Sequence, residues 1–225
     1  MSESRVEHIS AVATLTDPQR RALFDFVRSS ANPVSRDDAA TALEVPRSTA
    51  AFHLDRLVDE GLLEIEFKRL TGRTGPGSGR PAKLYRAAER ELSVSVPPRQ
   101  YDLAGELLAA AVEQSDRTGR PVRDVLTAVA TEAGRDLAAR SGGLDAALTS
   151  CGYEPQDDGD GGLLLTNCPF HKLATKHSDV ICQTNLALLE GVAEASGATD
   201  RRVEFVPPTD GHCCVRVVPA KAQDG

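Results

Sequence analysis

The segment that most constrains the fold is residues 71–81, a glycine- and proline-rich stretch between two runs in which apolar and polar residues alternate. The first run covers residues 62–67 and the second covers residues 82–86. Alternation with a period of two predicts β-strands, and a connection this rich in glycine predicts a hairpin with a long loop. No helical pattern follows the glycines directly and no Gly-Lys-Ser or Gly-Lys-Thr triplet occurs, so the stretch does not match a nucleotide-binding loop.

Three helical patterns precede the hairpin, each with its own start or stop signal. Asp17 followed by Pro18 is typical of an N-cap with proline at the first helical position, and it predicts a helix of about 13 residues. Ser35 is expected to cap a short second helix, and Pro46 separates that helix from a third one over residues 47–60, which ends at Gly61. Three helices followed by such a hairpin predict a winged helix-turn-helix over residues 16–90.

The third helix is the expected recognition element. Its buried face is predicted to contain Ala51, Leu54, Leu57 and Val58. Its other face carries residue types that contact phosphates and base edges in a major groove, namely Arg47, Ser48, Thr49, Phe52, His53 and Arg56. A merely solvated surface helix would look similar, but the hairpin that comes after it favours DNA binding.

The charge distribution supports a DNA contact although the net charge is −7. Residues 67–90 contain seven basic residues, Lys68, Arg69, Arg73, Arg80, Lys83, Arg86 and Arg90, against a single acid, Glu89. A basic patch on an acidic protein is sufficient for phosphate binding, because the position of the charges matters more than their sum. We expect Arg73 and Arg80 to bind phosphates or enter the minor groove, and Lys83 to contact DNA from the returning strand.

The N-terminal residues and the apolar runs favour a cytoplasmic protein without a membrane segment. Glu3, Arg5 and Glu7 stand where a signal peptide would have its basic and apolar regions, and no apolar run approaches the roughly 18 residues that span a bilayer. In a reducing compartment the five cysteines are poor candidates for structural disulfides. Metal-binding, cluster-binding and redox roles are therefore favoured over disulfide formation.

Prolines at positions 97 and 98 mark a domain boundary, after which helical patterns resume. The first of these patterns has an apolar stripe that fits either an intramolecular core or a dimer seam, formed by Leu103, Leu107, Leu108, Ala111 and Val112. We therefore expect an α+β protein with a winged helix-turn-helix DNA-binding domain over residues 1–96 and a helical linker or dimerisation region over residues 97–150. A small α+β metal- or cluster-binding domain is expected over residues 151–225.

Three cysteines of this last domain are expected to meet in the folded state. Cys168 is predicted in the first turn of a helix capped by Asn167, and Cys182 in the first turn of a helix capped at residue 178 or 179. Cys213 is predicted on a strand whose alternation places Cys214 on the opposite face. Cysteines are also common as ordinary buried apolar residues, and Cys151, which stands apart from the others, fits that interpretation.

Two stretches of sequence carry a resemblance to a known family. The sequence of residues 75–86 resembles the SufR-like branch of the ArsR-like winged-helix repressors; it reads Gly-Pro-Gly-Ser-Gly-Arg-Pro-Ala-Lys-Leu-Tyr-Arg. So does the set formed by Cys168-Pro169-Phe170-His171, Cys182 and Gly211-His212-Cys213. The resemblance implies a homodimer that binds an inverted-repeat operator in double-stranded DNA and senses an iron–sulfur cluster. Members with four cysteines carry one near the position of Phe205, so this chain departs from their pattern there.

Two cofactors match the predicted ligands. Three thiolates can hold a 4Fe-4S cluster in which another group binds the fourth iron, and a cluster of this kind is labile to oxidants. Alternatively, Cys168, His171, Cys182 and Cys213 form a Cys3His set that matches tetrahedral zinc. In either case occupancy of the site is expected to change the dimer geometry and hence the operator affinity.

Two alternatives without a cofactor remain. One is a thiol-redox regulator that uses Cys182 and Cys213. The other is a thiol enzyme in which His171 or His177 activates Cys168. A winged helix is an unusual companion for catalysis and no oxyanion-binding or acid partner is evident, so the prediction is a regulator and not an enzyme.

Overall fold

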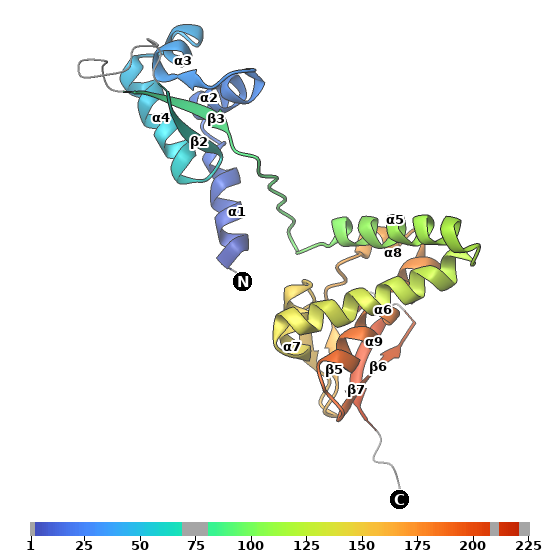
Figure 1. The fold of residues 1–225 in the computed structure, drawn as a ribbon. Helices are drawn as coiled ribbons and strands as arrows, with labels where there is room; N and C mark the ends of the chain where they lie inside the picture. The colour runs from blue at the N-terminus through green and yellow to red at the C-terminus, as the bar shows by residue number, and fades with distance from the viewer. Residues whose placement is uncertain (1–2, 69–80, 208–211, 221–225) are drawn as a thin grey trace, which may run out of the picture. The chain divides into compact units, whose positions relative to one another are not determined.

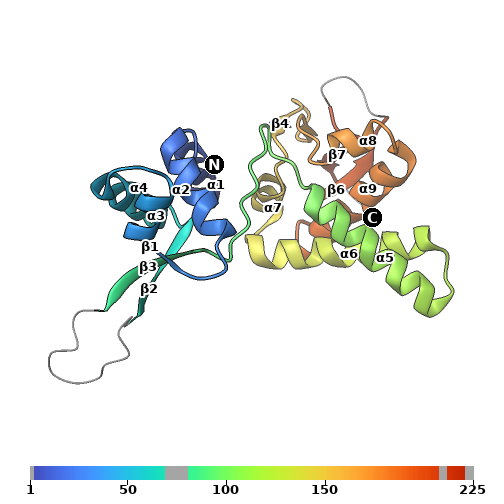
Figure 2. The same ribbon diagram turned by 90° about the horizontal axis from the view of Figure 1, so that it is seen from above.

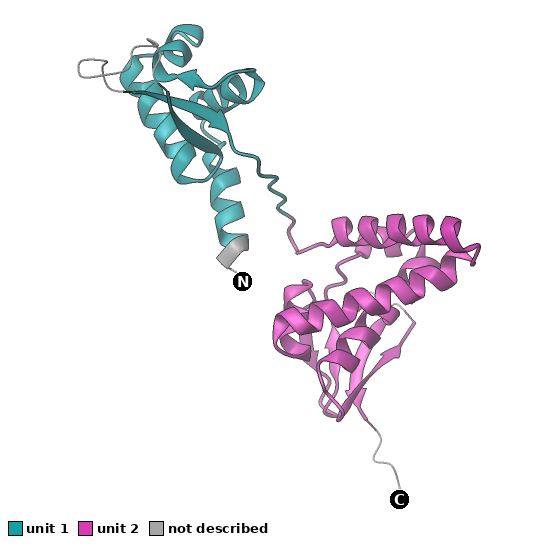
Figure 3. Cartoon of the chain, in the orientation of Figure 1, with its two compact units in different colours: residues 1–94 teal, residues 95–225 magenta. Residues whose placement is uncertain are grey.

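The computed structural model describes residues 3–68, 81–207 and 212–220. Within it the chain divides into two compact units, Met1–Val94 and Ser95–Gly225 (Figure 3). The helical region predicted for residues 97–150 and the sensor domain predicted for residues 151–225 therefore belong to one unit. The mixture of helices and antiparallel sheets fits the predicted α+β class.

The N-terminal unit places four helices around a small sheet (Figure 1). In chain order its elements are α1 (Glu3–Thr14), α2 (Pro18–Ser29), β1 (Val34–Ser35), α3 (Arg36–Ala42), α4 (Arg47–Asp59), β2 (Leu63–Lys68) and β3 (Ala82–Ala87). The sheet has the strand order β1-β3-β2, and both pairings are antiparallel. In the hairpin Leu63 lies opposite Ala87, and Lys68 lies opposite Ala82. The predicted helices and hairpin strands of the winged helix are thus confirmed.

The predicted cap signals start and end these helices. Asp17 accepts a hydrogen bond from the backbone N–H of Arg20 at 2.9 Å, with proline as the first helical residue. Ser35 and Asp38 form a reciprocal capping box at the start of α3. Helix α4 has Glu60 as its C-cap, and the next residue, Gly61, adopts a φ of 67°, a left-handed conformation that glycine takes without strain.

The first helix of the chain was not predicted from the sequence, because its apolar positions are too few to give a clear pattern. It nevertheless belongs to the N-terminal unit. Ala11 is completely buried in the core with Leu23, Leu54 and Tyr85. The hydroxyl group of Ser10 also donates to Glu60, which lies directly after α4 in the chain, at 2.7 Å.

The C-terminal unit combines a helical layer with a second antiparallel sheet (Figures 1 and 2). In chain order its elements are α5 (Tyr101–Thr118), α6 (Val122–Ser141), α7 (Leu144–Ser150), β4 (Pro155–Asp157), β5 (Leu163–Leu165), α8 (His171–Ala174), α9 (Ser178–Ala195), β6 (Arg201–Phe205) and β7 (Val215–Pro219). The strand order is β4-β5-β7-β6. Helix α9 packs on β6 and β7 and is covered on its other side by α6, which forms a helical hairpin with α5.

Helices α6 and α9 pack unusually closely because each places a glycine against the backbone of the other. A Cβ atom added to Gly134 would lie 2.0 Å from the carbonyl oxygen of Leu188, and one added to Gly191 would lie 2.0 Å from that of Thr131. Neither position has room for a side chain. The two glycines therefore set the distance between α6 and α9.

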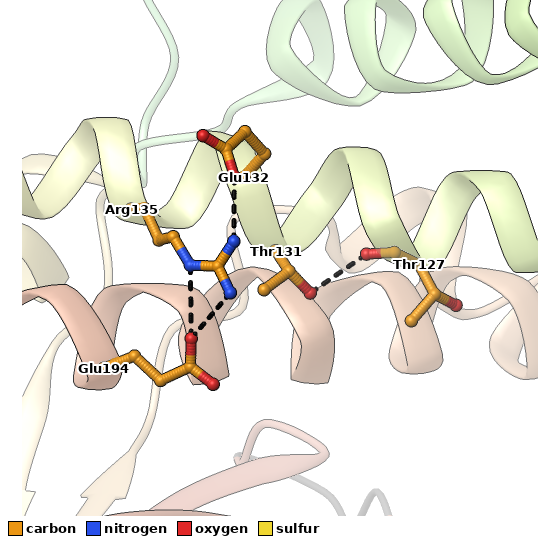
Figure 4. A network of polar contacts seen from close by, with 5 residues as sticks. All are labelled: Thr127, Thr131, Glu132, Arg135 and Glu194. Carbon is orange, nitrogen blue, oxygen red and sulfur yellow. Dashed lines mark hydrogen bonds and ion pairs between the residues drawn. The ribbon is translucent and has the colours of Figure 1, made fainter.

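A polar network borders this contact on the solvent side (Figure 4). Arg135 of α6 binds Glu194 of α9 at 2.9 Å and Glu132 of its own helix at 2.8 Å. These hydrogen bonds raise the pKa of the guanidinium, the bond to Glu132 contributing most. One turn away, the hydroxyl of Thr131 donates to the carbonyl of Thr127 at 3.0 Å. The charges are exposed, so they contribute to orientation more than to stability.

Part of the apolar stripe predicted on α5 is buried and part of it is exposed to solvent. Leu107 and Ala111 are buried together with helix α6 in one apolar cluster. Leu108 and Val112 remain 36% and 51% exposed and do not belong to this cluster. Only part of the stripe is therefore used inside this chain.

Candidate functional site

Four cysteines surround one cavity of about 600 Å³ in the C-terminal unit, and we call this cavity the thiol pocket. Its lining includes each predicted ligand, together with further residues that the sequence did not single out. The predicted ligands are Cys168, His171, Cys182 and Cys213, and the additional lining residues include Arg99, Asn167, His212 and Cys214. Cys151 lies in the apolar core instead, where burial raises the pKa of its thiol to about 11.

The elements that carry the cysteines differ from those predicted. Cys168 lies in the loop between β5 and α8, because α8 begins only at His171. Helix α9 begins at Ser178 with His177 as its N-cap, so Cys182 occupies the second turn and not the first. The helix-terminus environment expected for these two thiols is therefore absent from Cys182. For Cys168 a backbone hydrogen bond from Phe170 takes its place.

Cys213 and Cys214 are both buried, with 2% and 3% of their surfaces exposed. The prediction that Cys214 faces away from Cys213 was wrong, because β7 starts at Val215 and strand alternation does not extend back to the two cysteines. The backbone N–H of Cys213 donates to the carbonyl of Leu165 at 2.7 Å. This bond joins the end of β5 to the cysteine pair and brings it near the loop that carries Cys168.

The four thiols of the pocket form a chain of contacts that runs from Cys168 through Cys213 and Cys214 to Cys182. Hydrogen bonding with Cys213 lowers the pKa of Cys168, and it lowers that of Cys214 to about 6. The same bonds, first with Cys168 and then with Cys214, raise the pKa of Cys213. Burial raises the pKa of Cys182 to about 12. Thiolates this close repel one another, so without a cation they cannot all be ionised.

Within the described residues, no group of three or more His, Cys, Asp or Glu side chains is arranged so that it could hold a metal ion as it stands. Metal binding would have to replace the sulfur–sulfur contacts by sulfur–metal bonds, and it releases the thiol protons. His171, the remaining predicted ligand, lines the pocket with an exposed side chain.

Asn185 and Tyr153 form a buried polar pair beside the thiols, and the sequence analysis did not identify either residue. The side-chain amide of Asn185 donates to the sulfur of Cys213 at 3.2 Å and to that of Cys214 at 3.8 Å. Its carbonyl oxygen accepts a hydrogen bond from the hydroxyl group of Tyr153. Asn185 and Tyr153 are 1% and 2% exposed, and burial raises the pKa of Tyr153. The signal available in the sequence was a single asparagine on the apolar face of a long helix.

Asn167 does not cap a helix, contrary to the prediction. Its side-chain amide donates to the carbonyls of Pro98 at 3.1 Å and Gly152 at 2.6 Å, and its side-chain oxygen accepts from Arg99 at 2.5 Å. Arg99 donates with the same nitrogen to the carbonyl of Cys168 at 2.7 Å. Asn167 therefore fixes the cysteine loop through long-range hydrogen bonds instead of capping a helix.

In the N-terminal unit, α4 presents most of the predicted DNA contacts to solvent. Arg47, Ser48, Phe52 and Arg56 are exposed and Thr49 is half-buried. Phe52 has 65% of its surface exposed, which is unusual for so large an apolar side chain. Arg56 is paired with Glu60 at 2.6 Å, and Arg47 is paired with Asp37 of α3.

His53 is the exception among the predicted contacts. It is only 7% exposed, and its Nδ1 accepts a hydrogen bond from the guanidinium of Arg20 at 3.3 Å. The buried face of α4 consists of Ala50, His53, Leu54 and Leu57. The prediction had placed Ala51 in this face, a shift of one residue that turned His53 outward. His53 therefore connects α4 to α2 and does not belong to the exposed face.

Residues 15–66 match a family model for a helix-turn-helix domain. Searches of curated proteins and of solved structures found no match to the chain. The N-terminal unit is thus a helix-turn-helix domain, of the type that binds DNA in transcription regulators. None of the helices in the described part of the chain is long and apolar enough to cross a membrane.

Within the helix-turn-helix domain, Asp55 ties α4 to β3, the returning strand of the hairpin. Its carboxylate accepts hydrogen bonds from Lys83 at 2.5 Å and from the hydroxyl of Tyr85 at 2.7 Å. Desolvation acts to raise the pKa of Asp55, but these two bonds hold it below its usual value. Lys83, a predicted DNA contact, is thus bound to a carboxylate. The remaining predicted contacts, Arg73 and Arg80, lie outside the described residues.

Proposed function

We propose that this chain is a DNA-binding transcription regulator, a repressor, whose operator affinity is controlled by a thiolate-bound iron–sulfur cluster or metal ion in the C-terminal unit. The observation that carries the proposal is that Cys168, Cys182, Cys213 and Cys214, which come from three separate segments, meet in one cavity. Cysteines buried only for packing have no reason to line a cavity together with histidines and an arginine. The sequence resemblance to SufR-like regulators supports the same interpretation.

The donor set fits a thiophilic cofactor. Cysteine thiolates are the ligands of iron–sulfur clusters, and four of them, or three with a histidine, match zinc. In the proposal Cys168, Cys182 and Cys213 hold the cofactor, and Cys214 or His171 supplies the fourth ligand. A cluster would supply an oxidant-sensitive centre at this place, whereas zinc would supply a structural one. Asn185 would hold the two neighbouring sulfurs in position by donating its amide hydrogens to them.

Operator binding is proposed to involve a homodimer on an inverted repeat in double-stranded DNA, with one α4 in each half-site. The exposed side chains of α4, notably Arg47, Ser48 and Phe52, would enter the major groove. The partly exposed apolar residues Leu108 and Val112 of α5 are available for the dimer contact. Half-site spacing in such a dimer depends on the geometry of the C-terminal unit, which links cofactor occupancy to affinity.

A regulator that senses oxidants with thiols alone is the second candidate, and one observation favours it. Cys168 contacts Cys213, and Cys182 contacts Cys214, so the pocket contains two pairs of neighbouring thiols. A peroxide could oxidise either pair to a disulfide, taking up the two electrons and two protons of the thiols and leaving as water, or as water and an alcohol. The pairs differ from the pair of Cys182 and Cys213 expected from the sequence.

Anaerobic purification followed by visible absorption and metal analysis tests the proposal. We expect iron with sulfide, or zinc, in stoichiometric amount, and Cys182→Ser is expected to lose it. Cys151→Ser is the matched control, because Cys151 is equally buried but lies outside the pocket. A colourless protein that contains neither iron nor zinc would contradict the cofactor and leave the thiol-redox candidate.

A further inference from the structure

We propose that residues 97–100, which come after the helix-turn-helix unit in the chain, transmit the state of the thiol pocket to DNA binding. In this proposal Arg99 and Asn167 are the positioning residues that couple the segment to the pocket. The inference rests on the proposed function and adds to it the route by which the pocket acts on DNA binding. All the contacts that carry it lie within the C-terminal unit.

The first observation is that the loop bearing Cys168 holds this segment at three successive residues. The carbonyl of Pro98 accepts from the side-chain amide of Asn167 at 3.1 Å. Arg99 donates to both Asn167 and the carbonyl of Cys168, at 2.5 and 2.7 Å. The backbone N–H of Gln100 donates to the carbonyl of Pro169 at 3.1 Å.

The second observation is that the segment is confined from another side by the turn after α7. The carbonyl of Gly152 accepts from Asn167 at 2.6 Å, so one amide group bridges this turn and Pro98. Gly152 has a φ of 85°, and a Cβ atom added to it would lie 2.8 Å from the Cβ of Pro98. Glycine is required here by the backbone conformation and by the close approach of the segment.

The third observation concerns helix α5, which starts directly after the segment. It begins at Tyr101, whose hydroxyl accepts from the backbone N–H of Lys172 in α8 at 3.3 Å. The start of α5 is therefore tied to α8, the helix that directly follows the cysteine loop. Since α5 also carries the exposed residues Leu108 and Val112, a movement of this loop acts on both the segment and the proposed dimer helix.

These contacts give Arg99 a role that differs from that of a ligand. A change in the bonding of the Cys168 sulfur shifts the Cys168 backbone, and the carbonyl of that residue is one of the two acceptors that hold Arg99. The guanidinium then passes the shift to residues 97–100. Arg99 also lines the thiol pocket, but its side-chain hydrogen bonds go to the carbonyl of Cys168 and to Asn167, so it is not one of the proposed ligands.

The test is Arg99→Gln in the full chain, with the exposed Arg120→Gln as matched control. The operator is a duplex selected by the wild-type protein from a random pool. Its dissociation constant is measured for anaerobically purified, cofactor-loaded protein and for protein stripped with a chelator. For the wild type and for Arg120→Gln, we expect the dissociation constants of the loaded and stripped forms to differ about 10-fold, within the range usual for coupled sites. In Arg99→Gln, with unchanged metal content, the ratio is expected to fall to within about twofold of unity.

Hydrogen–deuterium exchange of peptides that cover residues 97–101 supplies a second readout. Loading is expected to slow exchange there in the wild type and not in Arg99→Gln. An unchanged affinity ratio in a variant that retains its metal would overturn the coupling. Loss of the metal from Arg99→Gln would overturn it too, because Arg99 would then belong to the binding site. Equal affinities of loaded and stripped wild type would instead refute the proposed function itself.

Discussion

Replacing Gly134 by alanine is expected to destabilise the C-terminal unit, whereas replacing Gly105 by alanine is expected to stabilise it. Both glycines lie inside helices, so both changes gain up to about 1 kcal/mol of helix propensity. A Cβ on Gly134 would lie 2.0 Å from the carbonyl oxygen of Leu188 and 2.9 Å from the backbone nitrogen of Val192. A Cβ on Gly105 would meet no atom within 4 Å.

The difference between the two sites sets the expected magnitude. Contacts between carbon and backbone oxygen require more than about 3 Å, so α6 and α9 would have to separate by roughly 1 Å along their contact. Overpacking of this kind costs about 1–3 kcal/mol, and the upper end applies because backbone atoms have no alternative rotamer. The gain of about 1 kcal/mol in helix propensity offsets part of this cost, so we expect Gly134→Ala to lower the free energy of unfolding by about 2 kcal/mol. Gly105→Ala has only the gain and is expected to raise the free energy of unfolding by roughly 0.5–1 kcal/mol.

Guanidinium unfolding of the full chain, followed by far-UV circular dichroism, measures both changes in the transition of the C-terminal unit. Gly191→Ala should behave like Gly134→Ala, since its added Cβ would meet the carbonyl of Thr131. Equal stabilities of the Gly134 and Gly105 variants would refute the close packing of α6 on α9.

Three further predictions concern the two candidate sites. Asp55→Asn should cost about 1 kcal/mol at pH 7, because the exposed side chain is screened and bound to Lys83 and Tyr85. The pKa of Asp55 is depressed, so its contribution is present above the unfolded value of about 3.9 and is lost as the pH falls through the folded pKa. Urea unfolding at pH 7 and pH 3 should therefore show a smaller deficit at the lower pH. Asn185→Leu should cost about 1–3 kcal/mol in thermal unfolding, since it leaves the buried hydroxyl of Tyr153 without its acceptor, and a deficit of zero would contradict the network. Simultaneous replacement of Arg73 and Arg80 by alanine should weaken operator binding and reduce the salt slope by up to about 2, whereas unchanged titrations would remove the loop from the interface.

The helix-turn-helix unit was predictable because its signals are local. The N-cap at Asp17, the capping box at Ser35 and the left-handed Gly61 each depend on neighbours within a few residues. The rotation of α4 was harder, since Ala50 and Ala51 offer the same apolar methyl to either face. Only the packed structure shows that Ala50 is the buried one and that His53 lies on the same inward face.

The thiol pocket was predictable in its composition and less so in its geometry. Cys168, Cys182 and Cys213 were expected to meet, and they line one cavity. The position of Cys214 depends on where β7 begins, which strand alternation cannot fix at its end. Asn167 looked like a cap because local spacing allows it, but its actual partners lie far away in the sequence, and tertiary contacts of this kind leave no periodic signal.

The comparison of cofactor-loaded and cofactor-free protein on operator DNA tests the central claim most directly. Operator affinity is measured at one fixed salt concentration for the anaerobically purified wild type, for the same protein stripped of metal, and for Cys182→Ser. We predict that the two wild-type forms differ about 10-fold in dissociation constant and that Cys182→Ser matches the stripped form before and after the same treatment. Identical affinities of the loaded and stripped wild type would contradict control of DNA binding by the thiol pocket.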